Sequence, residues 1–192
     1  MNEIKSICVF CGSSSGRKPE FVTAAKEMAL EMVHRNIDLV FGGGNDGLMK
    51  VVADEFVKHG KKTIGVIPQE YVDNGVEHPN ITKMVITKSM VERMDVMKQL
   101  SDGFIALPGS LGSFSELFNV LYSIRLGNMS KPCAVLNTAS FYNHLLKFLD
   151  ESVDNGFLNQ KQRDILISSD KPNEILNAFN NYEPFIFPRR WV

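Results

Sequence analysis

The sequence has only three cysteines in 192 residues, and this odd, uneven set does not form the disulfide framework of a small secreted domain. It also has little net charge, because 21 Lys and Arg balance 22 Asp and Glu, which argues against DNA or RNA as the main partner. No apolar run approaches the roughly 18 residues of a membrane helix. The short N-terminal apolar run breaks at Cys11–Gly16, before it reaches the length of a signal-peptide core. These absences predict a cytoplasmic protein without nucleic acid or membrane partners.

Length and composition are those of one globular domain over residues 1–192, with 44% hydrophobic and 22% charged residues. A chain of this size buries roughly 70% of its unfolded surface and needs no disulfide or metal to be stable. Its four histidines form no pair at metal-ligand spacing, so no metal site is expected. Cys8 and Cys11 match C-x-x-C, but they fall in an apolar run that predicts a strand, where positions i and i+3 face opposite sides. We interpret both as buried structural residues.

Short apolar runs alternate with helical patterns along the chain. Strands are predicted at 6–11, 38–41, 63–67, 81–87, 103–107 and 133–137. Helices are predicted at 19–34, 47–59, 90–100, 112–126, 141–155 and 172–180, with a polar loop at 69–80 and a short tail from 184 that contains Trp191. This alternation predicts a single Rossmann-like, doubly wound parallel sheet with helices on both faces.

Ligands of such sheets bind beyond the carboxyl ends of the strands, which directs attention to loops 12–16, 42–47 and 108–113. In the second loop, Gly42, Gly44 and Gly47 satisfy G-x-G-x-x-G, but after the second predicted strand rather than the first. The acid expected for a ribose, Glu70, lies beyond Pro68 in the polar loop. An NAD-dependent oxidoreductase is therefore weakly supported. A tight turn that packs a helix on a strand, or a glycine-lined pocket wall, explains the pattern as well.

The loop at 108–116 carries more chemistry. Gly109 and Gly112 let the backbone approach a ligand, Ser110 and Ser113 offer hydroxyls, and the following helix offers free N–H groups and its positive end. This combination predicts a phosphate cradle that is not a Walker loop, because no lysine follows the last glycine. Glu116 falls in the first turn of that helix. The residues alone leave open whether it is a catalytic carboxylate or a favourable partner of the helix dipole.

Together these segments resemble the LOG (Lonely Guy) family of cytokinin riboside 5′-monophosphate phosphoribohydrolases, often mislabelled lysine decarboxylases. The resemblance covers nearly the whole chain. It starts at residues 9–14 and continues through 41–49, which match YGGGxxGLM, and through 65–68. Met90-Val91-Glu92-Arg93-Met94 matches the family's MxxRK, and residues 108–116 match its PGGxGTxxE.

The resemblance implies hydrolysis of the N-glycosidic bond of AMP or an N6-substituted, cytokinin-type AMP, which releases the free base and ribose 5-phosphate without a cofactor. It implies that Arg93 and Glu116 are the catalytic pair, although Arg93 by itself would be interpreted as a solvated surface residue. A homodimer with sites at the subunit contact is also implied. The implied substrate-binding residues are Met90, Gly109, Ser110, Leu111, Gly112, Ser113, Phe114 and Ser115, together with Gly12, Ser13, Gly43 and Gly44. The alternative function is binding of a nucleotide or phosphorylated cofactor without turnover.

The chain departs from the family pattern at several positions. Ser110 replaces a glycine, which adds a side chain where the backbone could require positive φ or a close approach, and Ser113 replaces a threonine. Met94 replaces a lysine, and we interpret it as a core residue rather than as a cation lost from the site. Gly75 stands where many members have an acid, with Glu77 two residues away.

The predicted helix after the phosphate loop is apolar on more than one side, which favours a face covered by a partner as well as by the chain's own core. The residues of this pattern are Phe114, Leu117, Phe118, Leu121 and Tyr122.

Overall fold

The computed structural model describes residues 4–184, so Trp191 of the predicted tail lies outside the described residues. The strands are β1 (Ser6–Phe10), β2 (Asp38–Phe41), β3 (Thr63–Pro68), β4 (Lys83–Thr87), β5 (Gly103–Ala106), β6 (Cys133–Leu136) and β7 (Leu166–Ser169). The helices are α1 (Pro19–His34), α2 (Gly47–Lys58), α3 (Gln69–Asp73), α4 (Met90–Leu100), α5 (Leu111–Arg125), α6 (Asn143–Asp154), α7 (Gln160–Arg163) and α8 (Pro172–Asn180), with a 3-10 turn at Thr138–Ser140.

All seven strands run parallel in one sheet, in the order β4-β3-β2-β1-β5-β6-β7. The chain therefore winds outward from β1 to β4, returns to the other side of β1 and winds outward again. The direction of winding reverses between β1 and β5, and the loops that leave these two strands diverge there. Open α/β sheets bind ligands at such a switch point.

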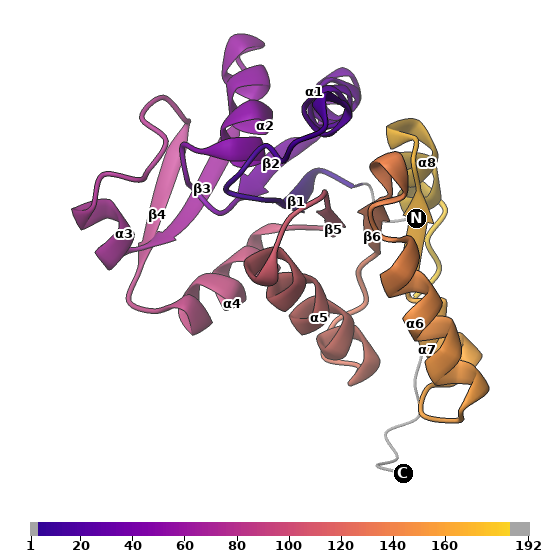
Figure 1. Cartoon of the computed structure of the whole chain (residues 1–192). Coiled ribbons are helices and arrows are strands. Elements are labelled where there is room, and N and C mark those ends of the chain that lie inside the picture. The colour runs from indigo at the N-terminus through magenta and orange to yellow at the C-terminus, as the bar shows by residue number, and fades with distance from the viewer. Residues whose placement is uncertain (1–3, 185–192) are drawn as a thin grey trace.

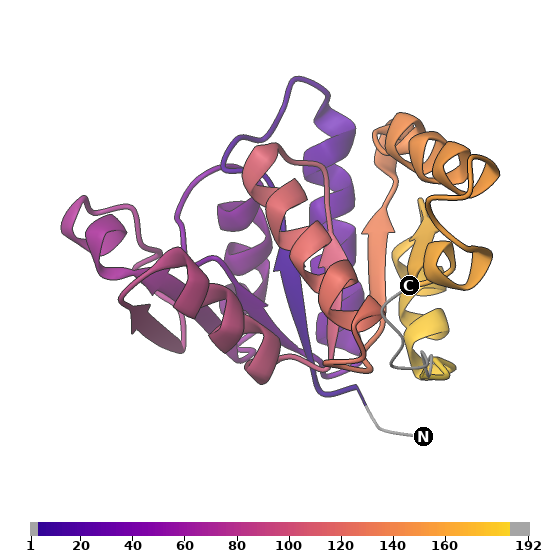
Figure 2. The same cartoon turned by 90° about the horizontal axis from the view of Figure 1, so that it is seen from below.

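Helices cover both faces of the sheet, as the sequence predicts (Figure 1). The layer of α1, α2 and α8 packs on one face through residues such as Met28, Val52 and Leu176. The layer of α4 and α5 packs on the other face through residues such as Met97 and Leu117, and Figure 2 shows these two helices lying across the sheet. The fold class is thus confirmed.

The two neighbouring cysteines lie on opposite faces of the sheet, because side chains alternate along a strand. Cys8 packs in the core under α4 and α5, whereas Cys11 packs in the core under α1 and α2. Both thiols are free and buried. The interpretation of the C-x-x-C match as structural is confirmed.

Two parts of the predicted element order are wrong. Residues 69–80 are not all loop, since α3 forms one short helical turn at Gln69–Asp73, too short and too exposed to show an apolar period. The strand β7, Leu166–Ser169, and the short helix α7 before it were not predicted. β7 is an edge strand whose apolar run, Ile165–Ile167, is only three residues long and is followed by two serines, so its pairing with β6 defines it.

Candidate active site

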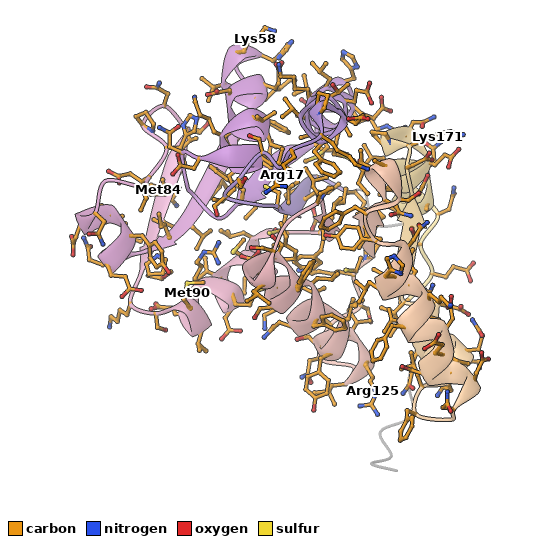
Figure 3. The ribbon with its side chains drawn as sticks, viewed as in Figure 1. Arg17, Lys58, Met84, Met90, Arg125 and Lys171 are labelled. Carbon is orange, nitrogen blue, oxygen red and sulfur yellow. The ribbon has the colours of Figure 1, made fainter. Side chains whose placement is uncertain are left out.

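A cleft of about 150 Å³ opens at the switch point of the sheet. The end of β1, the loop after β2, and the first turns of α4 and α5 form its walls, and Figure 3 labels Met90 at the start of α4. The lining residues are Val9, Phe10, Cys11, Ser13, Gly42, Met49, Met90, Arg93, Ser110, Gly112, Ser113 and Glu116.

Arg93 and Glu116 form an ion pair inside this cleft. Nη1 of Arg93 donates to Oε1 of Glu116 over 2.7 Å, and Nε of Arg93 donates to the carbonyl oxygen of Val66 over 2.9 Å. Only 10% of the arginine side chain and 14% of the glutamate side chain are exposed. The pair predicted from the sequence is therefore assembled, from two helices that lie on the same face of the sheet.

Local capping places Arg93 one turn into α4. The Ser89 hydroxyl accepts the backbone N–H of Glu92 over 3.2 Å, and the Glu92 carboxylate accepts the N–H of Lys88 over 2.7 Å. The first bond caps the helix, and together the two bonds fix the start of α4. With the helix start fixed, Arg93 points toward the sheet. Taken by itself, this arginine would be interpreted as a solvated surface residue, and that interpretation is wrong.

Burial raises the pKa of the Glu116 carboxyl above its ordinary value, and the Arg93 guanidinium acts in the opposite direction by favouring the carboxylate. Burial, assisted by the charge of Glu116, also raises the pKa of the Cys11 thiol well above its ordinary value. A thiol with so high a pKa is uncharged at neutral pH and is a poor nucleophile. Cys11 therefore contributes a small apolar surface to the cleft.

The loops after β1 and β5 pack back to back beneath the cleft. The N–H of Gly12 donates to the carbonyl of Pro108 over 3.1 Å, and a Cβ on Gly12 would lie 3.3 Å from the Cα of Gly109. A Cβ on Gly109 would collide with the side chain of Ser113. These two predicted substrate-binding glycines therefore support the cleft from below and do not line it.

Ser110 precedes the first residue of α5 and lines the cleft without capping the helix. Its φ is −127°, an extended conformation open to any residue, so the side chain that replaces the family's glycine causes no backbone strain. The expectation that this position could require positive φ is wrong. The first amides of α5 find no carbonyl within the helix, and Ser110, Gly112 and Ser113 at this helix start line the cleft.

Some of the other residues predicted to bind substrate line the cleft, and others do not. Met90, Ser13 and Gly112 line it. Leu111 is 83% exposed and Ser115 is exposed, and neither belongs to the lining. Phe114 packs on the other side of its helix against the rings of Phe141 and Tyr142.

Gly43 and Gly44 lie outside the lining, in the buried loop after β2. The carbonyl of Gly43 accepts the N–H of His78 over 2.8 Å, and Gly44 bridges to Glu77. Gly43 has a φ of +79°, where glycine is unstrained. These contacts favour the interpretation of the loop as a tight turn. Sequence reasoning missed Gly42 and Met49 as lining residues, although the carboxyl end of β2 pointed to them.

Met94 lies in the core under α4 and α5, 7% exposed and outside the cleft lining, which confirms its interpretation as a core residue. Met94→Lys is expected to destabilise the fold by about 2–3 kcal/mol, because a buried ammonium without a partner is costly. The free energy of unfolding in urea measures this. Val91→Lys on the same helix is the control, since Val91 is 74% exposed and its substitution should cost under about 0.5 kcal/mol. A fully stable Met94→Lys protein with a lower KM for AMP would favour the lost-cation hypothesis instead.

Three absences concern the described residues, 4–184, only. In that part of the chain, no group of three or more His, Cys, Asp or Glu side chains could hold a metal ion. No helix there is both long enough and apolar enough to cross a membrane. Among the described residues that line the cleft there is no lysine.

The fold and the cleft define a Rossmann-like α/β protein with a buried carboxylate–guanidinium pair at the switch point of the sheet. A family model described as "Possible lysine decarboxylase" matches residues 49–179. The chain is 39% identical over 183 residues to the cytokinin riboside 5′-monophosphate phosphoribohydrolase LOG7 of Arabidopsis thaliana, covering 95% of this chain and 84% of that relative. It is likewise 39% identical to LOG2 of the same plant, covering 96% of this chain and 88% of that relative. The chain belongs to this LOG family.

Solved structures share the fold at lower sequence identity. The molybdenum cofactor binding protein from Rippkaea orientalis has a TM-score of 0.71 at 19% identity and covers 93% of this chain and 97% of its own. The Moco carrier protein from Chlamydomonas reinhardtii has a TM-score of 0.69 at 18% identity, with 93% and 97% covered. At this identity the likeness concerns the fold alone.

Proposed function

We propose that this protein hydrolyses the N-glycosidic bond of a purine nucleoside 5′-monophosphate, AMP or an N6-substituted AMP, to the free base and ribose 5-phosphate. The observation that carries the proposal is the buried Arg93–Glu116 pair, 2.7 Å apart, beside the start of α5. The LOG relatives are named as phosphoribohydrolases of cytokinin riboside 5′-monophosphates, which supports the same chemistry here.

In this mechanism the Glu116 carboxylate acts on the anomeric carbon. Cleavage of the glycosidic bond leaves positive charge on the ribose ring, and a nearby carboxylate stabilises that charge and orients the attacking water. Arg93 is permanently charged and is a poor general acid. Its two hydrogen bonds, to Val66 and Glu116, suit a positioning role that also favours the ionised carboxylate.

The start of α5 is the proposed phosphate site. Its free amides, its positive dipole end and the hydroxyls of Ser110 and Ser113 are donors suited to a dianion. Binding the phosphate here fixes the ribose over the carboxylate, so that binding energy from a remote group serves the reaction. The base would lie along the apolar wall, where Phe10, Met49 and Met90 line the cleft.

Incubation of the purified protein with AMP and with N6-isopentenyl-AMP tests the proposal, with chromatography of the released base as the measurement. Base release that is proportional to enzyme and time supports hydrolysis. Saturable binding of either nucleotide without base release would instead support the binding protein considered as the alternative. Retention of NAD through purification would revive the oxidoreductase.

We further propose that the protein is a homodimer that pairs through α5. Phe118 and Tyr122 on this helix are 42% and 54% exposed, whereas Leu117 is fully buried, so the helix carries an apolar face that its own core does not cover. An apolar groove of about 160 Å³ adjoins this face, lined in part by Leu121 and Leu149. Exposed apolar surface of this kind is typical of a subunit interface.

Light scattering at micromolar concentration is expected to give the mass of a dimer, and Phe118→Glu should give a monomer, because a buried, unpaired charge opposes association. Lys58→Glu is the control, since Lys58 lies at the end of α2, on the other side of the sheet from α5 (Figure 3). A strictly monomeric wild-type protein would contradict the proposal.

Two broader proposals accompany this function. One is that residues 1–192 act as one domain, which the continuous seven-stranded sheet supports. The other is a cytoplasmic location, supported by three free, buried cysteines, because reduced thiols are typical of that compartment.

A further inference from the structure

The guanidinium of Arg93 is fixed on several sides. Its Nε donates to the Val66 carbonyl and its Nη1 donates to Glu116. The residue as a whole is only 8% exposed, so the guanidinium makes these bonds away from solvent. The remaining nitrogen, Nη2, faces the backbone of Gly42 in the loop after β2.

Gly42 has no side chain where Nη2 lies. A Cβ built on Gly42 would collide with Nη2 of Arg93 and would lie 3.2 Å from the Sδ of Met49. The thioether is a flexible end that can move. The guanidinium can move only by giving up a hydrogen bond to Val66 or Glu116.

The backbone of Gly42 does not itself require glycine. Its φ lies outside the left-handed region, unlike that of Gly43 at +79°, so an alanine at 42 meets no conformational penalty of its own. The requirement for glycine at this position therefore arises from the arginine. Gly112 gives the contrast within the same cleft, because a Cβ there meets nothing within 4 Å.

We propose that Gly42 is a positioning residue of this active site: the absence of its side chain leaves the space in which Arg93 is held against Glu116. The consequence for turnover rests on the proposed hydrolase function, whereas the placement of Arg93 does not. A methyl group at position 42 is expected to displace the guanidinium from the carboxylate and leave the phosphate site at α5 intact.

Gly42→Ala tests this with two independent readouts. The first is the 15N–1H NMR signal of Arg93 Nε, assigned by its loss in Arg93→Lys, whose slow hydrogen exchange reports the bond to Val66. The second is the pH dependence of kcat and KM for AMP. Gly112→Ala is the matched control for the NMR signal and for the pH midpoint, because it adds the same methyl group to the same cleft without touching Arg93.

In Gly42→Ala the Arg93 signal is expected to exchange rapidly or to vanish. kcat should fall about 10- to 100-fold, the scale of a misplaced catalytic group, with KM changed less than about threefold. The acid limb of the kcat profile should move to higher pH, because Glu116 loses the cation that favours its ionised form. Gly112→Ala should retain both the Arg93 signal and the pH midpoint.

A Gly42→Ala protein that keeps the slow Arg93 signal and the wild-type pH midpoint overturns the proposal. If the wild-type protein releases no base from nucleotides, the proposed function fails, and the Arg93 signal alone decides the role of Gly42. If Gly42→Ala does not fold, the Gly42→Ala/Arg93→Met double variant decides. If the double variant folds, the result supports a collision between the methyl group at position 42 and the Arg93 guanidinium. If the double variant does not fold although Arg93→Met alone does, the proposal is overturned.

Discussion

Glu116→Gln is expected to lower kcat for base release from AMP at least about 100-fold while the protein folds normally. The substitution keeps the shape of the side chain and an oxygen that can accept from Arg93, 2.7 Å away, but removes the negative charge. Stabilising a developing ribosyl cation requires that charge, and single electrostatic or acid–base groups typically contribute 10²–10⁴ in rate. Steady-state kinetics and circular dichroism of the variant measure the two parts of the prediction.

Asp95→Asn is the matched control. Asp95 lies on the same helix as Arg93, but its side chain is 57% exposed and is paired with Lys98 at the surface, so its charge should be dispensable. The wild-type pH profile gives a second check. Because burial raises the pKa of Glu116, its carboxylate becomes protonated at a higher pH than the carboxylate of an ordinary glutamate. The acid limb of the kcat/KM profile should therefore lie at a higher pH. Turnover at the wild-type rate by folded Glu116→Gln would refute the assignment.

AMP is expected to exceed adenosine by at least about 100-fold in kcat/KM. The start of α5 offers free amides and the hydroxyls of Ser110 and Ser113, whereas the nucleoside brings no anion to them. Two to three charge-assisted hydrogen bonds, at about 1.5–3 kcal/mol each, account for a difference of this size. Initial rates with both substrates at matched concentrations measure it.

The distribution of this effect between kcat and KM carries mechanistic information. If the phosphate also orients the ribose, adenosine should lose kcat as well as affinity, because remote binding energy is then used for positioning. Inorganic phosphate added with adenosine is the control, since it can fill the site without a covalent link to the ribose. Equal efficiency for nucleotide and nucleoside would mean that the loop at Gly109–Ser113 does not bind phosphate.

Much of this fold follows from local sequence. Helix α1 begins at Pro19 and ends at His34 as predicted, because its apolar residues recur at helical spacing and proline favours a first helical turn. The central strands are equally plain, since sheets covered on both faces use continuous apolar runs such as Phe104–Ala106. The elements that were missed, α3, α7 and β7, are short and half exposed, and such segments carry little periodicity.

In the candidate site, too, features contained in consecutive residues could be predicted, whereas features set by residues far apart in the sequence could not. The loop proposed to bind phosphate could be singled out from the sequence because its features are contained in consecutive residues: glycines, serines and the start of a helix. The role of Gly42 could not be predicted, because its φ is ordinary and the atom that excludes a side chain belongs to Arg93, 51 positions further along the printed sequence.

The sequence by itself determined the alternation of strands and helices and the glycine- and serine-containing loop after β5, and its resemblance to the LOG family singled out Arg93 and Glu116 as the proposed catalytic pair. The tertiary structure alone decided that Arg93, which in isolation suggests a surface residue, is buried against Val66 and Glu116. The physical reason is that adjacent helical residues point about 100° apart, so burial of each side chain depends on where the sheet and α5 lie. That arrangement arises only from long-range packing.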